Sequence, residues 1–307
     1  MGMTSRNPPV PPDAFMSAFT SNPYALIGML VSAGLLADPR AALGADEAPA
    51  PRPAGFAVER HRDIAYRTGP GADKERHALD VYTPKGKKDF PVVLFVHGGA
   101  WKWGDKALYA GIGESFAARG VGVVVCNYRL SPKVQHPAHV EDVAAAFAWT
   151  AENIAKYGGD REQLFVCGHS AGGHLVSLLA TDPAHLKAVK HAPGEIKGVI
   201  SISGVYKIYH TEKVFLEAFG KDEALCLKAS PLTHVAGKHP PFLIAYADMD
   251  YEHLDSMAKD MDAALRKVAN PCDLLVCKDR SHISIVINLV QLDDPLHKSI
   301  FDFVTRK

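Results

Sequence analysis

One stretch of the sequence decides the fold class: Leu164-Phe-Val-Cys-Gly-His-Ser-Ala-Gly-Gly-His-Leu-Val-Ser-Leu-Leu-Ala180. Residues 164–167 form a short apolar run typical of a buried strand, and residues 173–180 read as a helix. Gly168 and Gly172 flank Ser170 at the junction, where a neighbour with a Cβ would clash in a very tight turn. A G-x-S-x-G pattern between a strand and a helix indicates a nucleophile elbow, which would expose the Ser170 hydroxyl above the sheet.

Similar apolar runs recur along the chain and alternate with helical stretches. They are short, continuous and mostly β-branched or aromatic, which suits strands buried on both faces of a parallel sheet. The runs are residues 92–96, 121–125, 164–167, 198–202, 242–246 and 273–276. Between them, residues 140–154 and 254–265 carry apolar side chains at helical spacing. We therefore predict an α/β fold with a mostly parallel sheet, helices on both faces, and a leading antiparallel pair of strands within residues 64–83.

The composition is that of an ordinary globular protein. The 307 residues include 34 Lys+Arg and 34 Asp+Glu, so the formal net charge is +0 and no overall field attracts a polyanion. A general nucleic-acid-binding protein is therefore not expected. Hydrophobic residues make up 47% of the chain and charged residues 22%, which excludes a disordered, collagen-like or coiled-coil protein. The five cysteines include no C-x-x-C pair, so they predict neither a disulfide framework nor a zinc ribbon; an optional Cys272–Cys277 bridge rests only on their nearness.

The first 54 residues differ in composition from the rest of the chain. Residues 25–36 form an apolar run that is too short to span a bilayer, and residues 46–53 are polar and rich in proline. With the small residues 41–45 between them, this is the order of a signal-peptide core, cleavage region and linker. We expect residues 1–54 to be such a segment, residues 55–307 to be one catalytic domain, and the protein to be periplasmic or secreted. The alternative is a cytoplasmic protein whose N-terminal helix packs on the domain.

A second glycine motif follows a neighbouring run. His97-Gly-Gly-Ala-Trp101 comes directly after residues 92–96. Two glycines at the end of a strand leave backbone N–H groups unshielded and able to approach a ligand oxygen. We predict that Gly98, Gly99 and Ala171 supply the N–H groups of an oxyanion hole, where each donor typically lowers a reaction barrier by about 3 kcal/mol.

A nucleophilic serine needs a base to take its proton and a carboxylate to orient that base. After a nucleophile elbow of this kind, the acid comes first in the chain and the histidine last. Asp248 and Asp250 follow the run at residues 242–246, and His282 follows the last run. Asp250 is the better candidate because it lies deeper in the loop, whereas Asp248 is expected to cap the turn or to bond to backbone. The predicted catalytic residues are Ser170, Asp250 and His282.

Three other histidines lie beside these motifs and have structural explanations. We expect His97 to order the glycine loop through a bond to backbone, His169 to fill the variable place of the elbow, and His174 to lie one turn into the helix. A zinc site is not supported, because no H-E-x-x-H motif or matching carboxylate or cysteine is present, and nucleotide-binding motifs are also absent from the sequence. No metal or organic cofactor is expected.

Residues 204–241 are too long for a simple connection between two strands. They contain several aromatic side chains, and together with Trp101 they are predicted to form a small cap with an apolar pocket over Ser170. Trp101 and Tyr206 are the predicted substrate-binding residues. The alternative is that aromatic residues of this segment only pack a cap helix.

Further motifs accompany those above. Asn127-Tyr-Arg-Leu-Ser-Pro132 and Tyr157-Gly-Gly-Asp160 join the two glycine motifs and the late Asp250 and His282. Taken together, about residues 60–305 resemble the α/β-hydrolase carboxylesterases. The nearest groups are bacterial feruloyl- and acetylxylan-esterase-like enzymes of the BD-FAE type, with hormone-sensitive-lipase-like esterases, isoprenylcysteine methylesterases and kynurenine formamidases close by. The hormone-sensitive-lipase group usually has a third glycine in place of Ala100 and a sizeable N-terminal cap, so a large lipid substrate is not expected.

The resemblance implies an α/β-hydrolase fold and a serine carboxylesterase that hydrolyses short-chain or aryl esters through an acyl-enzyme. It assigns the nucleophile, acid, base and oxyanion donors to the same residues as the positional argument. Two alternatives remain: an arylformamidase similar to kynurenine formamidase, and a non-catalytic binding protein on the same fold. The expected partner is a small-molecule ester, with no nucleic acid and no stable membrane span, and the oligomeric state is open.

Overall fold

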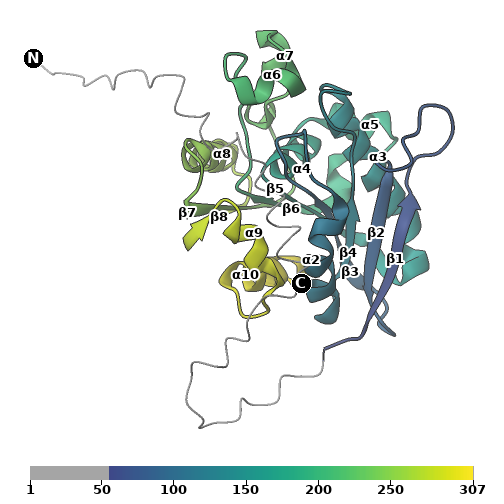
Figure 1. Ribbon diagram of the computed structural model, residues 1–307. Coiled ribbons are helices and arrows are strands. Elements are labelled where there is room, and N and C mark those ends of the chain that lie inside the picture. Colours follow the sequence, from purple (N-terminus) through teal and green to yellow (C-terminus); the bar gives the residue numbers. More distant parts are fainter. Residues whose placement is uncertain (1–54, 307) are drawn as a thin grey trace, which may run out of the picture.

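The computed structural model describes residues 55–306, in which eight strands form one sheet (Figure 1). The strands are β1 (Val58–Ala65), β2 (Ala78–Pro84), β3 (Phe90–Val96), β4 (Gly122–Cys126), β5 (Gly159–His169), β6 (Ile196–Ile202), β7 (Phe242–Met249) and β8 (Cys272–Ser281). Their order across the sheet is β1-β2-β4-β3-β5-β6-β7-β8. β2 is antiparallel to β1 and β4, and the other neighbouring pairs are parallel. The predicted mostly parallel sheet with a leading antiparallel pair is confirmed, although β1 begins at Val58, before the predicted range of residues 64–83.

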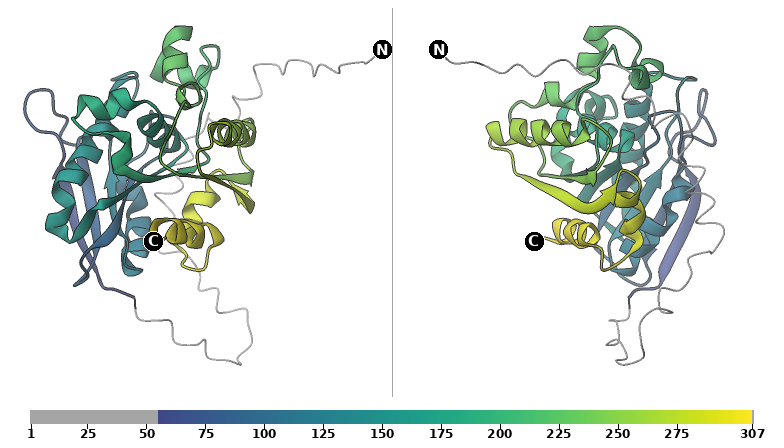
Figure 2. Two further views of the ribbon diagram at one scale, coloured as in Figure 1. Left: turned by 180° about the vertical axis from the view of Figure 1, so that it is seen from behind. Right: turned by 60° about the vertical axis from the view of Figure 1, so that its left-hand side comes forward.

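Helices cover both faces of the sheet, as predicted. One face packs against α3 (Ala138–Asn153), α4 (Ala171–Thr181), α5 (Pro183–Ala188) and α8 (Leu254–Lys267). The other face packs against α2 (Ala110–Ala118), α9 (Ser284–Ile287) and α10 (Pro295–Thr305). Figures 1 and 2 show α8 and α10 on opposite sides of the β7–β8 end of the sheet. The short 3₁₀ helices are η3 (Lys106–Tyr109), η4 (Ile154–Tyr157), η5 (Pro193–Glu195), η6 (Pro231–His234) and η7 (Asn288–Val290).

The register of the central strands brings the two glycine motifs together. Val96, the last residue of β3, pairs with Gly168 near the end of β5. Because the two strands are parallel, the His97–Trp101 loop and the turn at Ser170 leave the sheet at the same edge. Every residue of β3 is buried, so this part of the sheet is a rigid support for both loops.

The segment between β6 and β7 contains the small cap that was predicted from its length. It holds α6 (Lys213–Phe219) and α7 (Glu223–Lys228), which project at the top of Figure 1. The His136 N–H donates to the Ala218 carbonyl at 2.7 Å, and Lys102 forms an ion pair with Glu217 at 2.8 Å. These contacts attach α6 to the loops beside the sheet.

Strands β7 and β8 are longer than the apolar runs that predicted them. Pairing continues past the apolar residues as far as Met249 and Ser281, where the side chains are exposed or half-buried. The hydrogen-bond ladder, rather than hydrophobicity, sets these ends. His282 follows β8 directly and precedes α9, in the loop position expected for it.

The predicted signal-like segment, residues 1–54, lies outside the described residues. In the part of the chain from residue 55 to residue 306, no helix has the length and hydropathy needed to cross a membrane. All five cysteines are free thiols, and Cys277 is the most exposed of them, so the optional Cys272–Cys277 bridge is not formed.

Candidate active site

Ser170 lies in the strained turn between β5 and α4. Its backbone has φ 56 and ψ −118, a conformation that residues with a side chain rarely adopt. A Cβ on Gly172 would overlap the Val96 carbonyl oxygen, and a Cβ on Gly168 would overlap the backbone of Gly172. The two glycines therefore allow β5, α4 and the end of β3 to approach closely. The turn leaves Ser170 partly exposed, whereas its neighbours His169 and Ala171 are buried.

The structure brings Ser170, His282 and Asp250 together in one chain of hydrogen bonds. His282 Nδ1 lies 2.6 Å from Asp250 Oδ1, and His282 Nε2 lies 2.9 Å from Ser170 Oγ. A carboxylate oxygen only accepts, so the proton is placed on Nδ1 and Nε2 is left to accept the Ser170 hydroxyl proton. His282 is 3% exposed, and the Asp250 side chain is 2% exposed. The arrangement is a partly buried serine backed by a buried imidazole and a buried carboxylate.

Hydrogen bonds to Asp250 stabilise its ionised form. Burial alone would raise the pKa of this carboxyl, but the hydrogen bond and charge of His282, with a hydrogen bond from Ser203, hold the pKa below its ordinary value. Asp248 lies elsewhere: its exposed carboxylate accepts backbone N–H bonds from Asp279 and Arg280, each at 3.1 Å. The structure therefore places Asp250 beside His282 and gives Asp248 the backbone contacts expected of it.

Two aromatic rings hold His282 in place. The Tyr251 ring stacks on the imidazole with centroids 4.3 Å apart, and the His169 ring lies 4.7 Å away. His169 Nε2–H donates to the His282 carbonyl at 2.8 Å. Burial, followed by the charge of His282, lowers the pKa of His169 to about 3, so His169 remains neutral beside the base. Sequence reasoning treated His169 as a filler, and only its place in the elbow pointed to this contact.

The glycine loop after β3 lies against the turn at Ser170. A Cβ on Gly98 would lie 3.2 Å from Ser170 Cβ, which shows how close the two backbones are. The Ala171 N–H is at the first position of α4, where a helix supplies no acceptor of its own. Gly99 has φ 122, and a Cβ there would overlap the Trp103 carbonyl, so the turn requires glycine.

Gly98 differs from the other two predicted oxyanion donors. Its N–H donates to Tyr109 Oη at 3.3 Å, so in this structure the group is already paired. The sequence prediction did not consider Tyr109, which lies on η3 and is 4% exposed. Nothing in the spacing of the motif indicates that a tyrosine eleven residues later returns to this amide. His97 behaves as expected, since its Nδ1–H donates to the Gly98 carbonyl at 2.8 Å.

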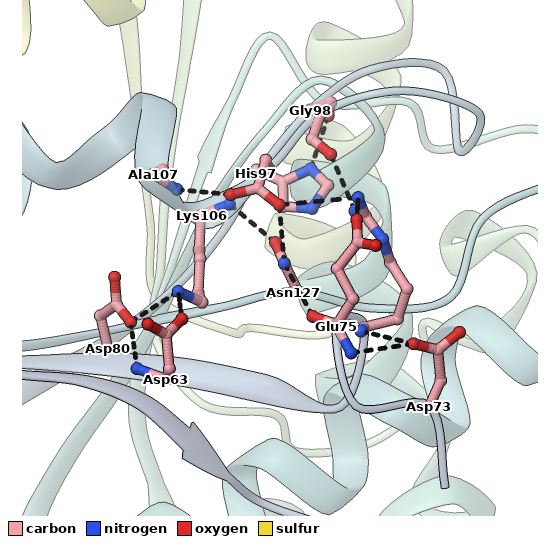
Figure 3. Close-up of polar contacts among 12 residues, drawn as sticks. Asp63, Asp73, Glu75, Asp80, His97, Gly98, Lys106, Ala107 and Asn127 are labelled. Carbon is pink, nitrogen blue, oxygen red and sulfur yellow. Dashed lines mark hydrogen bonds and ion pairs between the residues drawn. The ribbon is translucent and has the colours of Figure 1, made fainter. Parts of the chain in front are cut away.

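A charged network anchors the far end of the glycine loop (Figure 3). Lys106 Nζ lies 2.6 Å from Asp63 Oδ1 and 2.7 Å from Asp80 Oδ1. The Lys106 backbone N–H donates to Asn127 Oδ1 at 2.7 Å. Asp80 is on β2 and Asn127 follows β4, so both sides of the network are fixed to the sheet. The loop between β3 and η3 is thereby held at both ends.

The predicted substrate-binding residues are packing residues in this structure. Trp101 is 1% exposed: its Nε1–H donates to His174 Nδ1 at 3.2 Å, and its ring contacts Phe215 and Phe219 of α6. Tyr206 has 0% exposure, and its hydroxyl donates to Ser201 Oγ at 2.7 Å. The prediction that both line a substrate pocket is corrected, because neither ring has free surface left for a ligand.

Within residues 55–306, no group of three or more His, Cys, Asp or Glu side chains is arranged to hold a metal ion. On the α3 and α5 side of the sheet, His136 and His139 pack against the Phe219 ring. On α4, His174 Nε2–H donates to the Ala229 carbonyl at 2.7 Å.

The strand order, the elbow and the loops at the carboxyl edge define a protein of the α/β-hydrolase fold. The chain belongs to the BD-FAE family, whose sequence profile matches residues 79–261. The predicted resemblance is therefore confirmed.

Similar proteins of known sequence carry esterase names. The chain is 33% identical to esterase LipQ of Mycobacterium tuberculosis over 66% of this chain and 52% of LipQ. It is 32% identical to esterase LipC of the same organism over 73% of this chain and 61% of LipC. It is also 26% identical to a probable isoprenylcysteine alpha-carbonyl methylesterase of Arabidopsis thaliana, over 80% of this chain and 54% of the relative. The chain thus matches only between half and about three-fifths of the length of these relatives.

Solved structures confirm the fold. A truncated carbohydrate esterase from gut microbiota superposes with a TM-score of 0.69 at 19% identity, covering 83% of this chain and 98% of that one. Esterase B from Lactobacillus rhamnosis gives a TM-score of 0.66 at 24% identity, covering 80% and 86%. At this level of identity the likeness establishes a shared architecture.

Proposed function

We propose that the protein is a serine carboxylesterase that hydrolyses short-chain or aryl carboxylic esters. The observation that carries the proposal is the unbroken hydrogen-bond chain from Ser170 Oγ through His282 to Asp250, with Ser170 partly exposed and the other two side chains buried. The esterase names of relatives in the same family support it. A buried base beside an exposed hydroxyl activates that hydroxyl for attack on a carbonyl carbon.

The proposed mechanism has two steps. Ser170 Oγ attacks the ester carbonyl while His282 Nε2 takes the hydroxyl proton, and the Asp250 carboxylate stabilises the imidazolium. In this proposal the N–H groups of Ala171 and Gly99 donate to the oxyanion, and Gly98 joins them when its bond to Tyr109 opens. His282 returns its proton to the leaving alkoxide, so an alcohol departs and the acyl group stays on Ser170. Water, deprotonated by His282, then releases the carboxylic acid and restores the Ser170 hydroxyl.

The test combines covalent labelling with a panel of substrates. We expect a fluorophosphonate to label Ser170 and Ser170→Ala to reduce p-nitrophenyl acetate hydrolysis by several orders of magnitude, with an unchanged circular dichroism spectrum. Folded protein that is not labelled would indicate a non-catalytic binding protein. Faster hydrolysis of N-formylkynurenine than of the aryl ester would indicate an arylformamidase. Full activity of Ser170→Ala would remove this serine from the mechanism.

We propose further that the chain is exported. The support is the order of segments in residues 1–54: an apolar core, small residues, and a proline-rich linker. N-terminal sequencing of the mature protein tests this, and the expected first residue lies near Asp46. An intact N-terminus on protein purified from the cytoplasm would contradict it.

A further inference from the structure

Ser203 lies at the candidate site, and no sequence motif marks it. It follows β6 directly, is 1% exposed, and its Oγ lies 2.6 Å from Asp250 Oδ2. This oxygen is the one that does not face His282. A hydroxyl at this distance donates a short, charge-assisted hydrogen bond to the carboxylate.

The backbone at Ser203 is fixed on both sides by the catalytic framework. Its N–H donates to the Ala245 carbonyl of β7 at 2.7 Å, and the carbonyl of the preceding Ile202 accepts the Ser170 N–H at 2.8 Å. Ser203 also has φ 47, in the left-handed region that favours glycine. A serine is kept here at a cost in conformational energy, which is typical of residues whose side chain has a specific function.

The Asp250 carboxylate uses all of its accepting positions. Oδ1 accepts from His282 Nδ1 and from the Tyr251 N–H at 2.9 Å, whereas Oδ2 accepts from Ser203 Oγ and from the Ala247 N–H at 3.2 Å. The bond from Ser203 is the shorter of the two to Oδ2. Without it, Oδ2 is held only by the longer bond from the Ala247 N–H, and the carboxylate plane is less firmly fixed relative to the imidazole.

We infer that Ser203 is a positioning residue: its hydroxyl fixes the orientation of Asp250 so that Oδ1 stays directed at His282 Nδ1. The inference rests on the proposed function of the Ser170, His282 and Asp250 chain. Ser203 touches neither Ser170 Oγ nor the reacting carbonyl, so it acts through Asp250. Loss of the Ser203 hydroxyl is therefore expected to weaken the stabilisation of the imidazolium that forms during the reaction more than it weakens substrate binding.

The experiment compares Ser203→Ala and Ser203→Gly with Ser201→Ala in ester hydrolysis across pH. Glycine is favoured at φ 47, so Ser203→Gly removes the hydroxyl together with the backbone strain, and urea denaturation of each variant separates a loss of function from a loss of stability. Ser201 is a matched control, since its buried hydroxyl bonds to Tyr206 and the Gly173 carbonyl and not to Asp250. Both Ser203 variants are expected to lower kcat about tenfold with KM within about twofold, the effect of losing a hydrogen bond to a charged group. The acid limb of their pH profiles is expected to move to lower pH, because the imidazolium loses part of its carboxylate partner.

A proton NMR measurement makes the result independent of activity. The low-field signal of the His282 Nδ1 proton is expected to weaken or exchange faster in both Ser203 variants and to persist in Ser201→Ala. A wild-type pH profile and an intact signal in the Ser203 variants would overturn the inference while leaving the esterase proposal standing. Equal losses in Ser201→Ala would overturn it as well. An inactive wild type, or an active Ser170→Ala, would instead defeat the proposed function, and the NMR signal would still decide the role of Ser203.

Discussion

Mild acid is expected to unfold this protein because several histidines are buried in the neutral form. Burial is the largest cause that lowers the pKa of His97, His136 and His139 to about 4, and of His169 and His174 to about 3, from an ordinary value of 6.5. In the unfolded chain each of these rings takes up a proton near pH 6.5, whereas in the folded protein it stays neutral to about pH 4 or below. The stability they support is therefore fully present above pH 6.5 and is lost as the pH falls.

The size of the effect follows from the linkage relation. At about pH 5.5, one unit below the ordinary pKa, one such histidine lowers the free energy of unfolding by about 1.4 kcal/mol, so five of them lower it by roughly 7 kcal/mol. A domain is stable by about 5–15 kcal/mol in total, so this loss removes about half of the stability or more. Few carboxylates titrate between pH 6.5 and 5.5, which makes this window diagnostic for histidine.

Urea denaturation at a series of pH values, followed by tryptophan fluorescence, tests this prediction. The free energy of unfolding is expected to fall by several kcal/mol between about pH 7.5 and pH 5.5, with about five protons taken up on unfolding. His139→Gln removes one buried ring, and the pH slope is expected to decrease by about one proton. His253→Gln removes an exposed ring and is the control. A free energy of unfolding that stays constant over this range would refute the reasoning.

Three further predictions concern the carboxylates, the elbow and the charged network. Asp250→Asn is expected to lower kcat by about four orders of magnitude, because the imidazolium loses its charge partner, whereas Asp248→Asn is expected to keep its activity. Steady-state kinetics measure both variants. A larger loss of kcat in Asp248→Asn than in Asp250→Asn would show that Asp248 is the catalytic carboxylate. Gly172→Ala is expected to abolish folding or to lower the melting temperature steeply, because the added Cβ overlaps the Val96 carbonyl oxygen. Gly194→Ala is the control: no atom lies near its added Cβ, so the free energy of unfolding is expected to change by less than about 0.5 kcal/mol. Lys106→Met is expected to lower the free energy of unfolding by about 3–5 kcal/mol, because the buried Asp80 carboxylate on β2 loses its cation. An unchanged midpoint of urea denaturation would show that the charged network is not needed for stability.

Much of the fold was predictable because its signals are local. Each central strand of a parallel sheet is buried on both faces, so its sequence is a continuous apolar run, and five such runs marked β3 to β7. A sixth run marked β8, which lies at the edge of the sheet and is only partly buried. The ends of β7 and β8 were not predictable in this way, because strand pairing extends them into exposed residues. The antiparallel β1 has a largely exposed surface, and its charged sequence carries little hydrophobic pattern.

In the candidate site too, local features were predictable and contacts between separate elements were not. The glycines around Ser170 are required by backbone sterics at a single turn, so their pattern alone predicted that turn. The choice of Asp250 over Asp248 also followed from the chain, since their places in the loop differ. The contacts of Tyr109, Ser203 and Tyr251 could not be predicted, because each joins residues from separate elements and leaves no spacing in the sequence.

Trp101 shows the limit most clearly. An aromatic residue beside a glycine loop can line a substrate pocket or pack under a cap, and no feature of the sequence distinguishes these two roles. The position of α6 separates them: Phe215 and Phe219 cover the indole and leave no surface for a ligand. The succession of strands and helices along the chain and the turn at Ser170 depend on hydrophobic periodicity and local backbone sterics, so the amino-acid sequence was enough to predict them. The side chains that surround the hydroxyl depend on how distant segments pack together, so they became known from the folded structure alone.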